Sequence, residues 1–126
     1  MSYIGIVMVA LGASMGALAR WFLSLNFNQT FAYVPLGTLL SNLIGGYLIG
    51  LVVGCINIGV DISPEMRLLI MTGFLGGLTT FSTFSAEAVT MILKGDLTWA
   101  VLHIFLHLAG SILMTILGIY TARLIQ

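Results

Sequence analysis

Apolar residues fill most of this chain in four long tracts, which are separated by short segments rich in Asn, Pro, Gly and charged residues. The tracts lie at residues 4–23, 36–56, 67–93 and 98–120. A helix needs about 20 apolar residues to cross the hydrocarbon core of a bilayer, so each tract predicts one membrane-spanning helix. The expected fold class is an all-α membrane protein, with one four-helix transmembrane domain over residues 1–126.

The third tract is interrupted by the sequence GFLGGLTTFSTFS at residues 73–85. Three glycines within five residues weaken helical hydrogen bonding. Backbone that leaves the helix at membrane depth is tolerated only where protein or a polar cavity surrounds it. We therefore expect the third helix to be broken here, and such breaks in membrane proteins point to an ion or substrate site.

The composition excludes a soluble protein and a nucleic-acid-binding protein. The chain is 60% hydrophobic and 6% charged, with a mean hydropathy of +1.15, whereas a soluble domain carries about 25% charged residues. A net charge of zero provides no basic surface for nucleic acid.

No basic residue precedes the first tract and no small-residue cleavage pattern follows it, so we expect a permanent helix there. The lone Cys55 is expected to be a small packing residue.

The basic residues divide evenly between the two sides of the membrane. On an alternating four-helix path, Arg20 and Lys94 lie toward one side, and Arg67 and Arg123 lie toward the other. Because Lys and Arg asymmetry orients helical membrane proteins, such a chain can insert both ways and pair as an antiparallel dimer; the alternative is that other features orient it. GxxxG spacings on three helices favour a tightly packed bundle, with contacts either within or between subunits.

Three polar residues inside the tracts have both a structural and a functional interpretation, since polar groups at membrane depth usually face a cavity or a partner. Arg20 can anchor the first helix at the interface or draw anions into a vestibule. Asn42 can bond between helices or donate to a dehydrated anion. Glu87 can orient neighbouring hydroxyls or carry a proton.

Hydroxyl groups gather after the glycines of the third tract and recur in the fourth. They belong to Thr79, Thr80, Ser82, Thr83, Ser85, Ser111 and Thr115. A lone intramembrane hydroxyl commonly bonds back to its own helix, but a cluster of this density favours a line of donors along a cavity. Phe81 and Phe84 share a helix face by their spacing, and either pack against neighbours or present positive ring edges to an anion.

His103 and His107 are four residues apart in the fourth tract, so both project from one helix face. Two imidazoles can ligate zinc or haem, but no third ligand lies nearby in sequence and no HExxH pattern is present. Polar lining or interhelical bonding is the favoured interpretation. The chain also has no Ser/His/Asp constellation, P-loop or dinucleotide fingerprint, and we therefore expect no enzymatic activity.

The sequence GFLGGLTTFSTFSAE at residues 73–87 resembles the signature of the Fluc (CrcB) family of small bacterial fluoride channels. The resemblance extends over the other three helices, through GASMGALARW at residues 12–21, PLGTLLSNLIGG at 35–46 and AGSILMTILG at 109–118. It implies a dual-topology antiparallel homodimer in the bacterial inner membrane. Two pathways along the subunit interface would carry fluoride passively out of the cytoplasm, which confers fluoride resistance.

The same resemblance implies roles for individual residues. A central structural sodium ion would be held by backbone carbonyls at the third-helix break, at Gly76 and Thr79. The expected fluoride pathway comprises Arg20, Asn42, Phe81, Ser82, Thr83, Phe84, Glu87, Ser111 and Thr115. His103 and His107 match no signature of the family, so the resemblance assigns them no role.

Two other classes of membrane protein fit part of the pattern. A small multidrug transporter has a similar length, four helices and dual topology, but its essential acid sits in the first helix. Here the first tract has no acid, and Glu87 lies late in the third. The second alternative is a non-transporting membrane anchor or assembly subunit with His103 or His107 as haem ligands.

Overall fold

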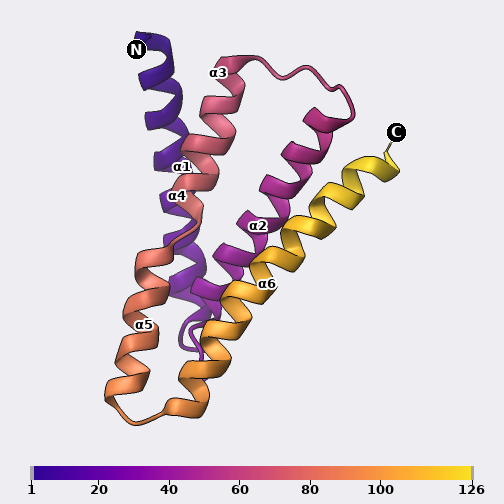
Figure 1. The fold of residues 1–126 in the computed structure, drawn as a ribbon. Coiled ribbons are helices and arrows are strands. Elements are labelled where there is room, and N and C mark those ends of the chain that lie inside the picture. The colour runs from indigo at the N-terminus through magenta and orange to yellow at the C-terminus, as the bar shows by residue number, and fades with distance from the viewer. Residues whose placement is uncertain (1, 126) are drawn as a thin grey trace.

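The computed structural model describes residues 2–125, which fold into helices joined by short turns (Figure 1). Three spans are continuous: α1 (Tyr3–Phe27), α2 (Leu36–Asn57) and α6 (Leu97–Leu124). The third span consists of α3 (Pro64–Arg67), the π-helix η1 (Leu68–Leu75), α4 (Gly76–Leu78) and α5 (Phe81–Leu93). All four spans are long and apolar enough to cross a membrane. The prediction of an all-α, multi-pass membrane protein is therefore confirmed.

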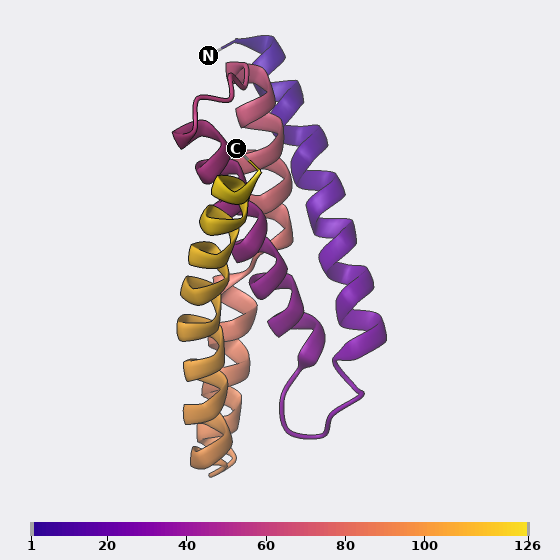
Figure 2. The same ribbon diagram turned by 90° about the vertical axis from the view of Figure 1, so that its right-hand side faces the viewer.

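The spans run alternately up and down and associate as two helix pairs. α1 packs along η1 and α4, and α2 packs along α6. In Figure 1 the α2 and α6 pair slants away from the upper part of the third span, whereas α5 and α6 come together at the lower end. Figure 2 shows α1 on the outer side of the third span. The two pairs therefore converge around the break in the third span.

Glycines allow the backbones of each pair to touch. A side chain on Gly16 would collide with the carbonyl oxygen of Phe74 and lie 2.7 Å from the amide nitrogen of Leu78. In the second pair, Gly50 of α2 faces the backbone of Thr115 in the same way. The GxxxG spacings therefore serve contacts within the subunit, a choice that the sequence left open.

The break in the third span lies just after the glycines. Gly76 is still helical, with φ −65° and ψ −35°. The chain becomes extended at Thr79 (φ −78°, ψ 153°) and Thr80 (φ −149°, ψ 115°). Thr80 then caps α5, because its hydroxyl oxygen accepts a hydrogen bond from the Thr83 amide at 3.1 Å. The predicted break is confirmed, but threonines form it, and the π-helix before it was not predicted.

Candidate functional site

Asn42 of α2 bridges the break in the third span. Its side-chain oxygen accepts a hydrogen bond from the Thr80 amide at 2.7 Å, and its side-chain nitrogen donates to the Thr80 carbonyl at 3.0 Å. These contacts satisfy two backbone groups that have left the helix, at a residue that is buried. The interhelical role considered for Asn42 is thus present in the structure.

The same amide group reaches the fourth span. Asn42 Nδ2 lies 2.9 Å from His107 Nδ1. Since the Asn42 oxygen already accepts from the Thr80 amide, the amide nitrogen is the atom that faces the ring and donates to it. His107 Nδ1 is therefore an acceptor, and the proton of the neutral imidazole lies on Nε2.

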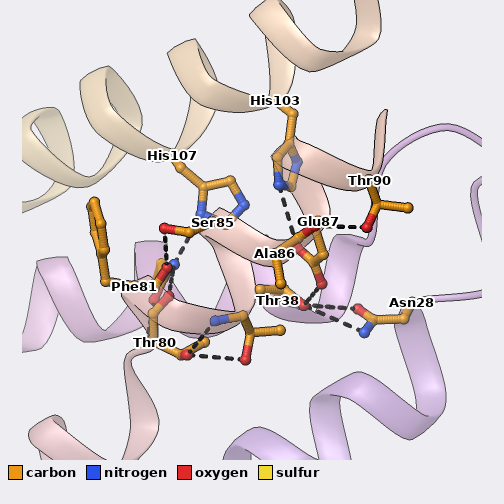
Figure 3. Close-up of polar contacts among 12 residues, drawn as sticks. Asn28, Thr38, Thr80, Phe81, Ser85, Ala86, Glu87, Thr90, His103 and His107 are labelled. Carbon is orange, nitrogen blue, oxygen red and sulfur yellow. Dashed lines mark hydrogen bonds and ion pairs between the residues drawn. The ribbon is translucent and has the colours of Figure 1, made fainter. Parts of the chain in front are cut away.

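Glu87 of α5 connects the second and fourth spans. Its Oε1 accepts a hydrogen bond from the Thr38 hydroxyl at 2.7 Å, and its Oε2 lies 3.3 Å from His103 Nε2. Thr38 is held in turn by Asn28, whose side-chain oxygen accepts from the Thr38 amide at 3.0 Å. Figure 3 shows this chain of contacts running from Asn28 to His103. Glu87 acts as an acceptor here, in line with the orienting role predicted for it.

The two histidines belong to this site, although the sequence assigned them no role in it. Both are buried, with 0% and 3% of their surface exposed, and their ring centroids are 4.4 Å apart. His107 also stacks on Phe84, with a centroid distance of 4.6 Å. The polar network, defined as Asn42, Thr80, Glu87, His103 and His107, thus joins three spans at the break. The spacing of four residues between the histidines indicated that they share a helix face. The sequence did not indicate which residues of the other helices that face contacts.

Phe81 and Phe84 are in edge contact, with centroids 5.3 Å apart. Their environments differ, because Phe84 is 6% exposed and packs against both histidines, whereas Phe81 is 72% exposed. The shared helix face is confirmed. The difference in burial was not predictable from the spacing.

The polar network lies between two openings. An open groove of about 440 Å³ is lined by Asn42, Gly76, Thr79, Phe81 and Ser111, together with Phe84 and His107. A second pocket of about 350 Å³ is lined by Thr83 and Glu87, together with the turn residues Lys94 and Asp96. Members of the network therefore face each opening, and the predicted residues Ser111 and Thr83 line one opening each.

The hydroxyl groups divide into two sets. Thr80, Ser82 and Thr83 form a local cluster, with the Thr80 and Thr83 hydroxyls 3.0 Å apart and those of Thr80 and Ser82 3.3 Å apart. By contrast, the hydroxyls of Ser85 and Thr115 donate to the carbonyls of Phe81 and Ser111 in their own helices. The first set lies at the break and in the first turn of α5, whereas the second set bonds within its own helices.

Arg20 binds the third span. Its Nε donates to the carbonyl oxygen of Gly77 at 3.0 Å, a contact between two spans rather than the interfacial anchoring considered for it. The guanidinium also borders a small pocket that Thr80 and Thr83 line.

The break removes the helical hydrogen bond of the Gly76 carbonyl group. In a continuous helix it would accept from the Thr80 amide, but that amide binds Asn42 instead. Thr79, at the end of the helix, lines the same groove as Gly76. Both residues whose carbonyls were expected to hold a cation therefore lie at the break and line one groove.

Comparison with known proteins identifies the family. Residues 7–119 match the family described as "CrcB-like protein, Camphor Resistance (CrcB)". The chain is 53% identical over 121 residues to the fluoride-specific ion channel FluC of Tolumonas auensis, covering 96% of this chain and 95% of that protein. It is 51% identical over 123 residues to the protein of the same name from Cupriavidus metallidurans, covering 98% of each. For the one from Pseudomonas aeruginosa the identity is 53% over 116 residues, covering 92% of this chain and 91% of that protein. With its four spans and broken third helix, this chain belongs to the CrcB family.

Proposed function

We propose that this protein is a fluoride-selective ion channel of the bacterial inner membrane, which lets fluoride leave the cytoplasm passively. The observation that carries the proposal is the polar network at the helix break, placed between two openings and flanked by Phe81 and Phe84. Close relatives named as fluoride-specific ion channels support it. The relatives are channels and not enzymes, in agreement with the expectation that the chain has no enzymatic activity.

Selectivity for fluoride requires a narrow path with hydrogen-bond donors close to the ion. Fluoride is small and strongly hydrated, so the donors of a path that excludes chloride must replace the water around fluoride at short range. The hydroxyl cluster of Thr80, Ser82 and Thr83 supplies short-range donors. Asn42 can donate to fluoride only by exchanging one of its bonds to the Thr80 carbonyl and His107. The edges of the Phe81 and Phe84 rings add positive partial charge without a fixed cation that would trap the ion. The negative interior of the cell then drives the anion outward.

The functional unit we propose is an antiparallel homodimer with two pathways. In one subunit the groove is open, and Phe81, which lines it, is 72% exposed. A second copy laid over the groove would enclose the path and bury Phe81 against protein. The even distribution of Arg20 and Lys94 against Arg67 and Arg123 supports insertion in both directions.

A structural sodium ion at the dimer centre is the cofactor we propose. The backbone carbonyls of Gly76 and Thr79 from each subunit would supply four oxygens. The ion would fix the two breaks against each other and offset the charge of passing anions. If it is required, exhaustive replacement of sodium by a large organic cation should abolish assembly and efflux; unchanged assembly and efflux would contradict the sodium site.

The test of the channel is ion efflux from liposomes that contain the purified protein and are loaded with fluoride or with chloride, with valinomycin carrying the compensating potassium. We expect rapid loss of fluoride and retention of chloride. Loss of neither anion would contradict the channel and favour a proton-coupled transporter or a membrane anchor. A haem absorbance band in the purified protein would favour the anchor.

The matched variant for this assay is Phe81→Ile. Losing the ring edge should lower fluoride flux by about tenfold, the equivalent of about 1.4 kcal/mol in the barrier. Phe105→Ile is the control, since Phe105 is similarly exposed on α6 but lines neither opening. Equal flux in the two variants would mean that Phe81 serves only packing.

A further inference from the structure

Glu87, His103 and His107 form a cluster whose polar atoms converge. One ligand atom of each lies within 4.8 Å of those of the other two. The closest pair is Glu87 Oε2 and His103 Nε2, at 3.3 Å. The side chain of Glu87 is 16% exposed and that of His103 is fully buried. Within residues 2–125, Glu87 Oε2, both ring nitrogens of His103 and His107 Nε2 have no hydrogen-bond partner.

We propose that these three side chains bind a divalent transition metal ion of the Zn²⁺ type. Two imidazoles and one carboxylate make a His₂Glu ligand set, which zinc accepts with a fourth position open. Zinc lies about 2.0–2.1 Å from nitrogen and about 2.0–2.2 Å from oxygen, which sets tetrahedral ligands about 3.4 Å apart. Glu87 and His103 already have this spacing. A metal ion would also satisfy three of the four buried atoms that have no partner, leaving only His103 Nδ1.

A cation can reach the cluster from the second pocket. Glu87 lines this pocket, and so does Asp96, at the turn between α5 and α6. Lys94 lines the same pocket and opposes the approach of a cation. The carboxylate of Glu87, which faces the pocket as well as His103, is therefore the first ligand that an entering ion meets.

His107 can become a ligand only by giving up its bond to Asn42. A metal ion on Nε2 places the ring proton on Nδ1, where it would face the donor nitrogen of Asn42 at 2.9 Å. Binding therefore separates Asn42 from His107. Because Asn42 holds the extended backbone at Thr80, the metal ion acts on the break as well as filling the space between the openings. Metal binding would thus block the pathway, a consequence that rests on the proposed function.

The test uses Co²⁺ as a coloured substitute for Zn²⁺. The full-length protein in detergent, with Cys55→Ala to remove the only thiol, is titrated with Co²⁺ while its visible absorbance is recorded. We expect a saturable band typical of a tetrahedral site. Glu87→Gln, His103→Gln and His107→Gln should each weaken binding by at least about 10–100-fold, the effect of losing even an outer-shell partner. Glu65→Gln, in the first turn of α3, is the matched carboxylate control and should bind normally.

The outcomes of this titration are decisive even if one variant fails to fold, because three ligand variants are compared by elution profile and by affinity. Absence of saturable binding in the parent overturns the proposal. Binding of unchanged affinity in a folded His103→Gln or His107→Gln protein overturns it as well.

A second measurement separates the metal site from the channel. Zn²⁺ added to fluoride-loaded liposomes should block efflux through the parent protein, and His103→Gln should need at least about tenfold more Zn²⁺ for the same block. Efflux that continues at saturating Zn²⁺ would overturn the position of the site on the pathway. Saturable Co²⁺ binding in a protein with no fluoride efflux at all would support the metal site and contradict the proposed function instead.

Discussion

The third span divides at Thr79 into an apolar half, which packs against α1, and a polar half, which contacts α2 and α6. In the apolar half, close backbone contact holds the helices together, as at Gly16 against Phe74 and Leu78. In the polar half, side-chain hydrogen bonds hold them together, with Asn42 on Thr80 and Thr38 on Glu87. One continuous tract in the sequence is therefore stabilised by shape at one end and by polar pairing at the other.

The difference separates two requirements of a channel subunit. Lipid offers no hydrophobic driving force between helices, so contact between small residues is an effective way to fix the scaffold. A scaffold made in this way presents no polar side chain to an anion. The polar half supplies those atoms, and each must be held by a partner because an unpaired polar group at this depth is costly.

The largest loss of stability is expected from Gly16→Val, which disrupts helix packing in the apolar half. The valine side chain would meet the backbone of Phe74 and Leu78, which cannot rotate away as a side chain would. Overpacking against backbone should destabilise the fold by about 3 kcal/mol or more. The measurement is thermal unfolding in detergent with the elution profile. Gly5→Ala is the control, since its added carbon would meet only the flexible end of Leu68 at 3.1 Å; equal losses of stability would contradict the role of backbone contact.

An intermediate effect is expected from Asn42→Ala in the polar half. The change leaves the amide and carbonyl of the buried Thr80 without their partner, which should lower the free energy of unfolding by about 2 kcal/mol. Fluoride flux should fall in the same variant. Asn26→Ala is the matched control, because Asn26 bonds only to its own helix at an exposed site. If Asn42→Ala is as stable as the control, the extended backbone at the break does not depend on Asn42.

The smallest effect is expected from Thr38→Val, which removes the hydroxyl that binds Glu87 at 2.7 Å. The loss of this bond should lower the free energy of unfolding by about 1 kcal/mol, since the shape of the side chain is kept. Ser85→Ala provides the comparison, because Ser85 is half-buried and bonds only to its own helix; its effect should stay within about 0.5 kcal/mol. If both variants unfold alike in a chemical denaturation series, the Thr38–Glu87 bond contributes nothing to stability.

Local features of the chain were predictable to within a few residues. Two helix ends follow local residue preferences: the Ser63 hydroxyl accepts from the Met66 amide, and Gly95 has φ +82°. The break was placed in the right segment but was attributed to its glycines. In the structure Gly73 and Gly77 remain in the third span as contact points for α1, while Thr79 and Thr80 leave the helix.

The sequence by itself determined the four spans, the interrupted third helix and the identity of Asn42, Phe81, Phe84 and Glu87 as candidate site residues. Apolar length and local turn chemistry are properties of short segments, and they can be read without knowing what a segment packs against. Tertiary structure alone decided which partners these residues have. It placed His103 against Glu87 and His107 against Asn42, across 16 and 65 positions of the chain, and it buried Phe84 while leaving Phe81 exposed. The physical reason is that a buried polar group needs a hydrogen-bond partner. Which residue is the partner depends on how separate helices pack, and a local sequence pattern holds no information on that packing.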